Sequence, residues 1–161
     1  MAKILTVNPE LCTSCKLCEL VCSVKKEGVS DPSRSRIHVF IREMEGLFLP
    51  VFCRHCRNPV CASVCPVEAI AFDPSLGRVL FDEDVCTGCG ECLEACPLGG
   101  ARWDTEQEKP LRCDFCEGDP SCVKYCSTGA LQYVEADESV KEEMRQAAEK
   151  LYDEFHNVSG R

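Results

Sequence analysis

Residues 86–97 read CTGCGECLEACP, and this run carries more structural information than any other part of the chain. Its four cysteines follow the spacing C-x2-C-x2-C-x3-C, with a proline directly after the last one. The spacing recurs near the N-terminus, and two further groups differ only in a longer middle gap. All sixteen cysteines belong to these four groups, so the chain repeats one kind of binding motif. In chain order the groups are Cys12, Cys15, Cys18 and Cys22; Cys53, Cys56, Cys61 and Cys65; Cys86, Cys89, Cys92 and Cys96; and Cys113, Cys116, Cys122 and Cys126.

This spacing indicates the chemistry of the sites. Three closely spaced cysteines and a more distant fourth are the ligand pattern of 4Fe–4S clusters, and the Cys-Pro endings at Cys65 and Cys96 match the bacterial ferredoxin motif. Structural zinc sites instead use two C-x2-C pairs separated by a loop. Disulfides are typical of secreted proteins, and residues 1–9 hold too short an apolar run for a signal peptide. We therefore predict four 4Fe–4S clusters with all sixteen cysteines as iron ligands, and zinc and disulfides are the alternatives.

Length and charge restrict the remaining possibilities. The chain has 161 residues, enough for one compact domain or two very small ones. Its formal net charge of −9 argues against nucleic acid as a partner. Thiolates and cluster cores together would bring the charge to roughly −17, which favours a basic docking face on a partner protein. No apolar run approaches the length of a membrane span, so we expect a cytoplasmic protein without membrane insertion.

Short regular elements are predicted between the cysteine groups. Residues 36–52 form two apolar runs around Gly46, and residues 66–82 form two more around a Pro-Ser-Leu-Gly turn, so each reads as a β-hairpin. Residues 130–134 predict another strand, and a short helix is expected between the third and fourth cysteine of each group. The fold class is therefore α+β, with short strands and short helices.

The segment 137–157 has a different pattern. Its apolar residues recur every three or four positions, and Ser139 with Glu142 forms a capping box, which together predict a C-terminal amphipathic helix. Such a helix either covers the rest of the chain and shields a cluster from water, or docks onto another subunit or a second copy. The apolar residues are Val140, Met144, Ala147, Ala148, Leu151, Tyr152 and Phe155.

These motifs resemble a known family. The chain is similar to the four-cluster ferredoxin-like electron-transfer subunits that accompany molybdopterin and tungstopterin oxidoreductases and some hydrogenases. The resemblance covers residues 3–135 and implies a double ferredoxin-like domain over residues 1–135. Groups one and four would form one two-cluster module, and groups two and three the other. The segments that carry it are CTSCKLCELVC at 12–22, CRHCRNPVC at 53–61, CTGCGEC at 86–92, RCDFC at 112–116 and DPSCVKYC at 119–126.

The resemblance also implies which cysteines share a cluster, because the fourth cysteine of one group serves the cluster of its paired group. Cys22 and Cys126 are followed by Ser23 and Ser127 instead of proline, and we expect these hydroxyls to donate hydrogen bonds near a cluster. The implied ligand sets are Cys12, Cys15 and Cys18 with Cys126; Cys113, Cys116 and Cys122 with Cys22; Cys53, Cys56 and Cys61 with Cys96; and Cys86, Cys89 and Cys92 with Cys65.

The implied role is electron transfer without catalysis, since the sequence contains no phosphate loop, dinucleotide motif or paired nucleophile and base. The segments CELVCS at 18–23 and SRSRI at 33–37 are most similar to small subunits of tungsten-dependent aldehyde oxidoreductases. The implied partner is a large catalytic pterin-containing subunit. A flavin- or NAD-binding subunit, a ferredoxin acceptor, and copies of this chain stacked end to end are further candidates.

Three other functions are compatible with the motifs. They are a free polyferredoxin that shuttles between enzymes, a hydrogenase-associated electron-transfer subunit, and an accessory protein that delivers clusters. Among the other residues, His55 lies between two cysteines and is expected to be an exposed loop histidine.

Overall fold

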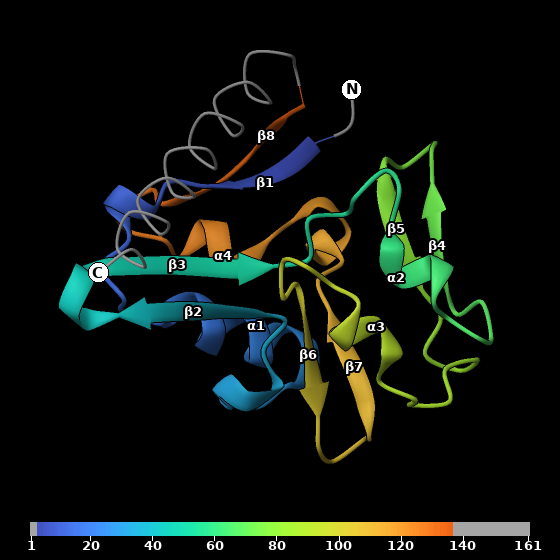
Figure 1. Ribbon diagram of the computed structural model, residues 1–161. Helices are drawn as coiled ribbons and strands as arrows, with labels where there is room; N and C mark the ends of the chain where they lie inside the picture. Colours follow the sequence, from blue (N-terminus) through green and yellow to red (C-terminus); the bar gives the residue numbers. More distant parts are fainter. Residues whose placement is uncertain (1–2, 137–161) are drawn as a thin grey trace, which may run out of the picture.

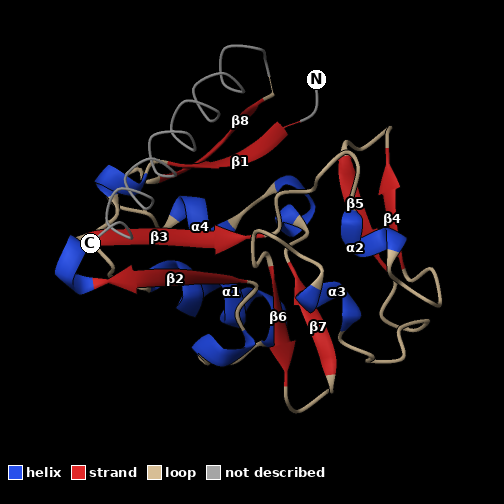
Figure 2. Cartoon of the chain, in the orientation of Figure 1, coloured by secondary structure: helices blue, strands red, loops and turns tan. Residues whose placement is uncertain are grey.

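The computed structural model describes residues 3–136, and they form short strands and short helices joined by long loops (Figures 1 and 2). This agrees with the predicted α+β class. The predicted helix over 137–157 lies outside the described residues. Within the described part of the chain, no helix has the length and apolar character needed to cross a bilayer.

The described strands pair into four separate antiparallel ribbons. The first ribbon joins the two ends of the described chain, and the other three are hairpins between neighbouring strands. The pairs are β1 (Lys3–Val7) with β8 (Leu131–Glu135), β2 (Ile37–Arg42) with β3 (Leu47–Phe52), β4 (Ile70–Asp73) with β5 (Arg78–Phe81), and β6 (Ala101–Asp104) with β7 (Lys109–Arg112).

Residues in the turns stabilise the hairpins. Gly46 adopts a φ of 63° between β2 and β3, a conformation that glycine adopts without strain. In the β4–β5 turn the Asp73 carboxylate accepts hydrogen bonds from the backbone N–H groups of Ser75 and Leu76. Asp104 does the same after β6, accepting from the N–H groups of residues 106 and 107. The hairpins expected over 36–52 and 66–82 are confirmed, whereas the β6–β7 hairpin was not predicted.

Every cysteine group contributes one α-helix, and each helix begins one residue before the third cysteine of its group. The short helices expected between the third and fourth cysteines are therefore present. The first is longer than expected, because no glycine or proline interrupts the chain until Gly28, which ends it at a φ of 73°. The helices are α1 (Leu17–Glu27), α2 (Val60–Ser63), α3 (Glu91–Glu94) and α4 (Ser121–Lys124). Single 3-10 turns occur at η1 (Pro9–Leu11), η2 (Pro32–Arg34), η3 (Glu43–Glu45) and η4 (Phe115–Gly118).

The arrangement brings distant cysteine groups together. The β1–β8 ribbon runs in register from Lys3 opposite Glu135 to Val7 opposite Leu131. The first cysteine group follows β1 and the last group precedes β8, so the ribbon brings these two groups together. Helices α1 and α4 pack against each other, and α2 packs against α3. In Figure 1, β1, β8, α1 and α4 occupy one end of the molecule and β4, β5, α2 and α3 the other, with β6 and β7 between them.

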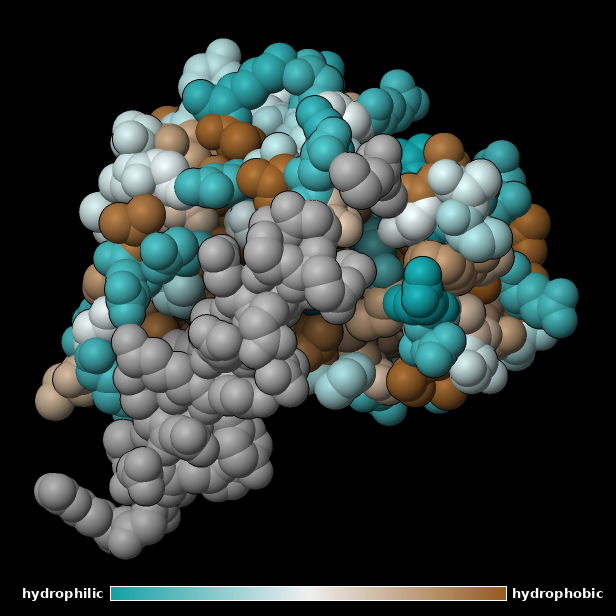
Figure 3. Space-filling model, turned by 90° about the horizontal axis from the view of Figure 1, so that it is seen from above, coloured by the Kyte–Doolittle hydropathy of each residue, from teal (hydrophilic) through white to brown (hydrophobic). Residues whose placement is uncertain are grey.

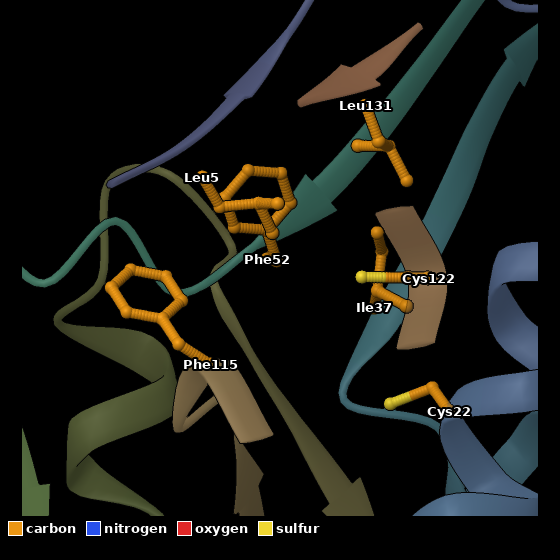
Figure 4. Close-up of a cluster of buried hydrophobic side chains, with 7 residues drawn as sticks. All are labelled: Leu5, Cys22, Ile37, Phe52, Phe115, Cys122 and Leu131. Atoms are coloured by element: carbon orange, nitrogen blue, oxygen red, sulfur yellow. The ribbon is translucent and has the colours of Figure 1, made fainter. Parts of the chain in front are cut away.

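The apolar core is thin. The main cluster of buried side chains joins both ends of the chain to the β2–β3 hairpin, and two of its seven members are cysteines (Figure 4). A second cluster holds Ile70, Val79 and Cys92. Apolar residues also remain on the surface, scattered among polar ones (Figure 3). With so few large side chains buried, we expect bound cofactors to supply much of the stability. The main cluster is Leu5, Cys22, Ile37, Phe52, Phe115, Cys122 and Leu131.

Candidate iron–sulfur cluster sites

Four cysteines surround a cavity between the first and fourth groups. The cavity is partly open to solvent, and its other walls come from apolar side chains such as Leu5 and Ile37 and from Lys26, Arg36 and Asp114. One cysteine comes from α1, and the other three come from the η4 loop and α4. The packing of α1 against α4 is what brings these two parts of the chain together. The four cysteines are Cys22, Cys113, Cys116 and Cys122.

A second cavity, also lined by four cysteines, lies between the second and third groups. Its apolar walls include Ile70 and Phe81 from the β4–β5 hairpin. Three of its cysteines belong to the third group and one is the last cysteine of the second group. The four cysteines are Cys65, Cys86, Cys89 and Cys92.

Electrostatic interactions connect the other cysteines of the first group with the last cysteine of the chain. Burial raises the pKa of Cys12, and the nearby thiols of Cys126 and Cys15 raise it further, while a backbone hydrogen bond from Ser14 opposes the shift. Cys18 interacts electrostatically with Cys12 and Cys15. The structure thus brings the last cysteine of the chain beside the first group, as the β1–β8 register requires.

A close backbone contact joins the second group to the last cysteine of the third. The backbone N–H of Gly100 donates to Cys96 Sγ at 3.4 Å. A side chain on Gly100 would place its Cβ 2.9 Å from both Cys53 Cα and the Phe52 carbonyl oxygen, so only glycine fits there. Cys96 therefore lies next to the start of the second group.

Backbone N–H groups point at cysteine sulfurs in several loops. The donors are Arg36 to Cys22, Gly88 to Cys86, Gly100 to Cys96 and Leu131 to Cys126, each at 3.4 Å. Several non-glycine residues beside the cysteines have positive φ, which turns successive N–H groups toward a common centre. Such donors stabilise negative charge on sulfur, as iron–sulfur ligation requires.

The thiols are buried where a free thiolate would be unstable. Burial raises the pKa of Cys18 and Cys122 to about 12, and neighbouring acidic or thiol groups add to the effect. Burial also raises the pKa of Cys113 well above its usual range. A coordinated metal removes this obstacle, because it supplies positive charge to the sulfur and deprotonates the thiol. Four soft sulfur donors around one apolar cavity fit a 4Fe–4S cluster. Among the described residues, no three His, Cys, Asp or Glu side chains converge on a point suited to a single metal ion.

Two sequence expectations need correction. His55 is buried, not exposed: only 6% of its surface is accessible, and its Nδ1 accepts a hydrogen bond from the Val79 N–H at 3.0 Å. Its ring centroid lies 4.0 Å from that of Phe115. The Ser23 hydroxyl donates to the Leu20 carbonyl oxygen of its own helix at 2.9 Å instead of to a cysteine.

A hydroxyl near a cysteine belongs to a residue that the sequence did not single out. Thr128 Oγ1 lies 3.7 Å from Cys126 Sγ. Sequence reasoning also missed three further residues near the sites. Lys26 forms an ion pair with Asp114, and Arg112 Nη1 lies 3.5 Å from Cys61 Sγ. The position of Arg112 directly before Cys113 gave no sign of this contact, since Cys61 is 51 residues away.

Comparison with known proteins shows the family of the chain. Residues 44–136, more than half of the chain, match the family model described as a 4Fe-4S dicluster domain. The polyferredoxin-like subunit of an aliphatic sulfonate oxidoreductase from Pyrococcus furiosus is 37% identical over 120 residues, covering 74% of this chain and 69% of the relative. One polypeptide of the anaerobic dimethyl sulfoxide reductase of Escherichia coli is 33% identical over 150 residues, covering 82% of this chain and 73% of the relative.

The fold also occurs in a solved structure. A polypeptide of the BamBC active-site complex of benzoyl-coenzyme A reductase superposes with a TM-score of 0.51 over 96% of this chain and 92% of that chain, at 23% identity. This likeness concerns the fold alone. The cysteine-lined cavities are consistent with the family match and with the relatives. The chain therefore belongs to the 4Fe-4S dicluster family.

Proposed function

We propose that this chain is an electron-transfer subunit of an oxidoreductase complex, and that it relays electrons through four 4Fe–4S clusters without catalysing a reaction itself. One observation carries the proposal. Two cavities are each lined by four cysteines, three from one group and one from another. This shared arrangement is the one used by two-cluster ferredoxins.

The proposed ligand sets follow that arrangement. Cys22, Cys113, Cys116 and Cys122 would hold one cluster, and Cys65, Cys86, Cys89 and Cys92 a second, each around its own cavity. For the third, the electrostatic contact between Cys12 and Cys126 supports a set completed by Cys15 and Cys18. The fit of Gly100 between Cys96 and Cys53 supports the fourth set, completed by Cys56 and Cys61.

We further propose two modules within residues 1–135. Groups one and four form one of them, supported by the α1–α4 packing and the β1–β8 ribbon. Groups two and three form the other, supported by the α2–α3 packing. The contact between the rings of His55 and Phe115 connects them, because each ring immediately precedes the second cysteine of its group. This contact between loops of the two proposed modules supports a continuous electron path through both.

The partner we propose is a large pterin-containing catalytic subunit, of the tungsten-dependent aldehyde oxidoreductase kind that the sequence resembles. Two relatives are named as components of oxidoreductases, which supports assembly with a catalytic chain. A flavin- or NAD-binding subunit, a ferredoxin, or further stacked copies would accept the electrons. We place the complex in the cytoplasm, where thiols stay reduced and available for ligation.

Anaerobic purification of the native protein tests this proposal. We expect about sixteen irons and about sixteen sulfides per chain, a brown chromophore bleached by dithionite, and a co-eluting large subunit that contains tungsten or molybdenum and a pterin. Zinc in place of iron would contradict cluster binding. A chain that elutes alone with its clusters intact would instead support a free polyferredoxin. A partner without pterin would remove the aldehyde oxidoreductase assignment.

A further inference from the structure

The side chain of Arg112 lies between the second and third cysteine groups. It extends from the last residue of β7 and is only 8% exposed. Its Nη1 donates to Cys61 Sγ at 3.5 Å, and its guanidinium carbon lies 5.9 Å from the centre of the Phe81 ring. Phe81 and Cys92 both line the cavity of the third group, whereas Cys61 belongs to the second. Arg112 therefore contacts both sites.

Cysteine sulfurs lie around Arg112: Cys61, Cys92 and Cys53 are all within electrostatic range of its guanidinium. Within residues 3–136, Arg112 forms no salt bridge to a carboxylate. Its Nε and Nη2 are buried and have no hydrogen-bond partner of normal geometry there. A buried cation with unused donors requires nearby negative charge, and sulfur atoms are the acceptors that line this space.

The first and fourth groups are different in this respect. Two cations line their cavity, and each is paired with a carboxylate: Lys26 with Asp114 and Arg36 with Glu27, so these charges largely cancel. Arg112 has no such counter-charge among the described residues and faces sulfur on both sides. Its field therefore acts on the second and third groups and is not neutralised locally. In a dry interior such a field is weakly screened.

We propose that Arg112 is a tuning residue shared by two clusters: it donates N–H···S hydrogen bonds to Cys61 of one site and Cys92 of the other, and it raises the reduction potential of both. This inference rests on the proposed function. A fixed positive charge favours the reduced, more negative state of each adjacent cluster, and N–H donors to sulfur act in the same direction.

A redox titration of the full-length protein, followed by electron paramagnetic resonance, tests the inference. Arg112→Gln removes the charge, so we expect the midpoint potentials of two of the four clusters to become more negative by clearly more than those of the other two. Arg112→Lys keeps the charge but contacts only one sulfur, so we expect a smaller shift in the same direction. Arg57→Gln is the matched control. It removes the same charge from an exposed position within the second group, where water screens it, and should leave all four potentials close to wild type.

The iron content of each variant separates the two proposals. Wild-type protein without about sixteen irons would contradict the proposed function itself. If all variants keep their iron, unchanged potentials in Arg112→Gln, or a shift no larger than that of Arg57→Gln, overturns the role of Arg112. If Arg112→Gln loses iron, the potentials of Arg112→Lys decide whether Arg112 tunes the clusters. Wild-type potentials in Arg112→Lys would mean that the arginine has only a structural role, which would also overturn the proposal.

Discussion

Gly88 is the residue at which backbone geometry restricts the sequence most sharply. It adopts a φ of 70°, and a Cβ built on it would lie 2.4 Å from the carbonyl oxygen of Glu108. Its N–H also points at Cys86 Sγ, so the conformation serves a proposed iron ligand. The loop of the third group can therefore approach the β6–β7 turn only if this position has no side chain.

Gly88→Ala should accordingly destabilise the loaded protein. Both the positive φ and the steric overlap with a backbone atom act against it, and we expect a loss of about 3 kcal/mol or more. Gly90→Ala is the matched control, because Gly90 has a φ of 79° but open space around its Cβ position. That variant should lose only about 1–2 kcal/mol. Anaerobic thermal unfolding followed by circular dichroism measures both, and equal losses would show that the Glu108 contact is unimportant.

Phe115 gives a second prediction for a single residue. It is 4% exposed and packs against the rings of His55 and Tyr133. Phe115→Ala would leave a cavity at the junction between two cysteine groups and should cost about 3–5 kcal/mol of stability. Phe40→Ala, at a side chain that is 42% exposed, should cost far less. Denaturant unfolding under nitrogen compares the two, and similar midpoints would refute a structural role for the ring junction.

Sequence reasoning identified the iron–sulfur family because the spacing of the cysteines reflects local chemistry. It failed with His55 because an imidazole between two loop cysteines carries no sign of the Phe115 ring, which is supplied from a distant part of the chain. Arg112 was missed for the same reason, since its partner Cys61 becomes a neighbour only in the folded chain. The cysteines and their spacing predict which residues bind iron. The charged side chains around these ligands depend on tertiary packing, which the sequence pattern does not show.

At the level of elements, the predicted hairpins were those rich in β-branched and aromatic residues. The β2–β3 and β4–β5 hairpins have such strands. The β6–β7 hairpin has strands of four residues that read ARWD and KPLR. Their charged residues and proline do not fit the usual strand pattern, so this hairpin was not predicted. The β1–β8 pairing also escaped prediction, because it joins segments at opposite ends of the chain.

The β1–β8 ribbon makes a prediction of its own. Leu5 is 3% exposed and packs in the main core beneath the ribbon. Leu5→Asp buries a charge there and should separate the chain ends, so the two sites that combine groups one and four should lose their metal. Iron analysis should fall from about sixteen to about eight per chain. Leu80→Asp, on β5 at a side chain that is 40% exposed, should keep the full complement. Retention of all iron by the Leu5 variant would contradict this account.

For the whole molecule, metal and fold are expected to be coupled. The two apolar clusters are small, and cysteines contribute to both. Burial of one large apolar side chain provides only about 1.5–3 kcal/mol, so the protein core alone gives a narrow stability margin.

Removal of iron with a chelator and an oxidant should therefore unfold the chain. We expect loss of both the visible chromophore and the strand signal in circular dichroism, and recovery of both after anaerobic reconstitution with iron and sulfide. Incubation of the loaded protein with the chelator alone controls for non-specific effects. An iron-free chain with an unchanged spectrum and a cooperative thermal transition would show that the protein core suffices.

The meeting of β1 with β8 has a consequence for biosynthesis. On the proposed ligand sets, a nascent chain leaving the ribosome has all the thiols of the second and third groups available once Cys96 has emerged. The sites that include Cys12 and Cys22 must wait until the residues around Cys126 have been translated. The assembly machinery would thus fill the middle of the polypeptide first and its two ends last, and an early stop after residue 100 would yield a half-loaded fragment rather than an empty one.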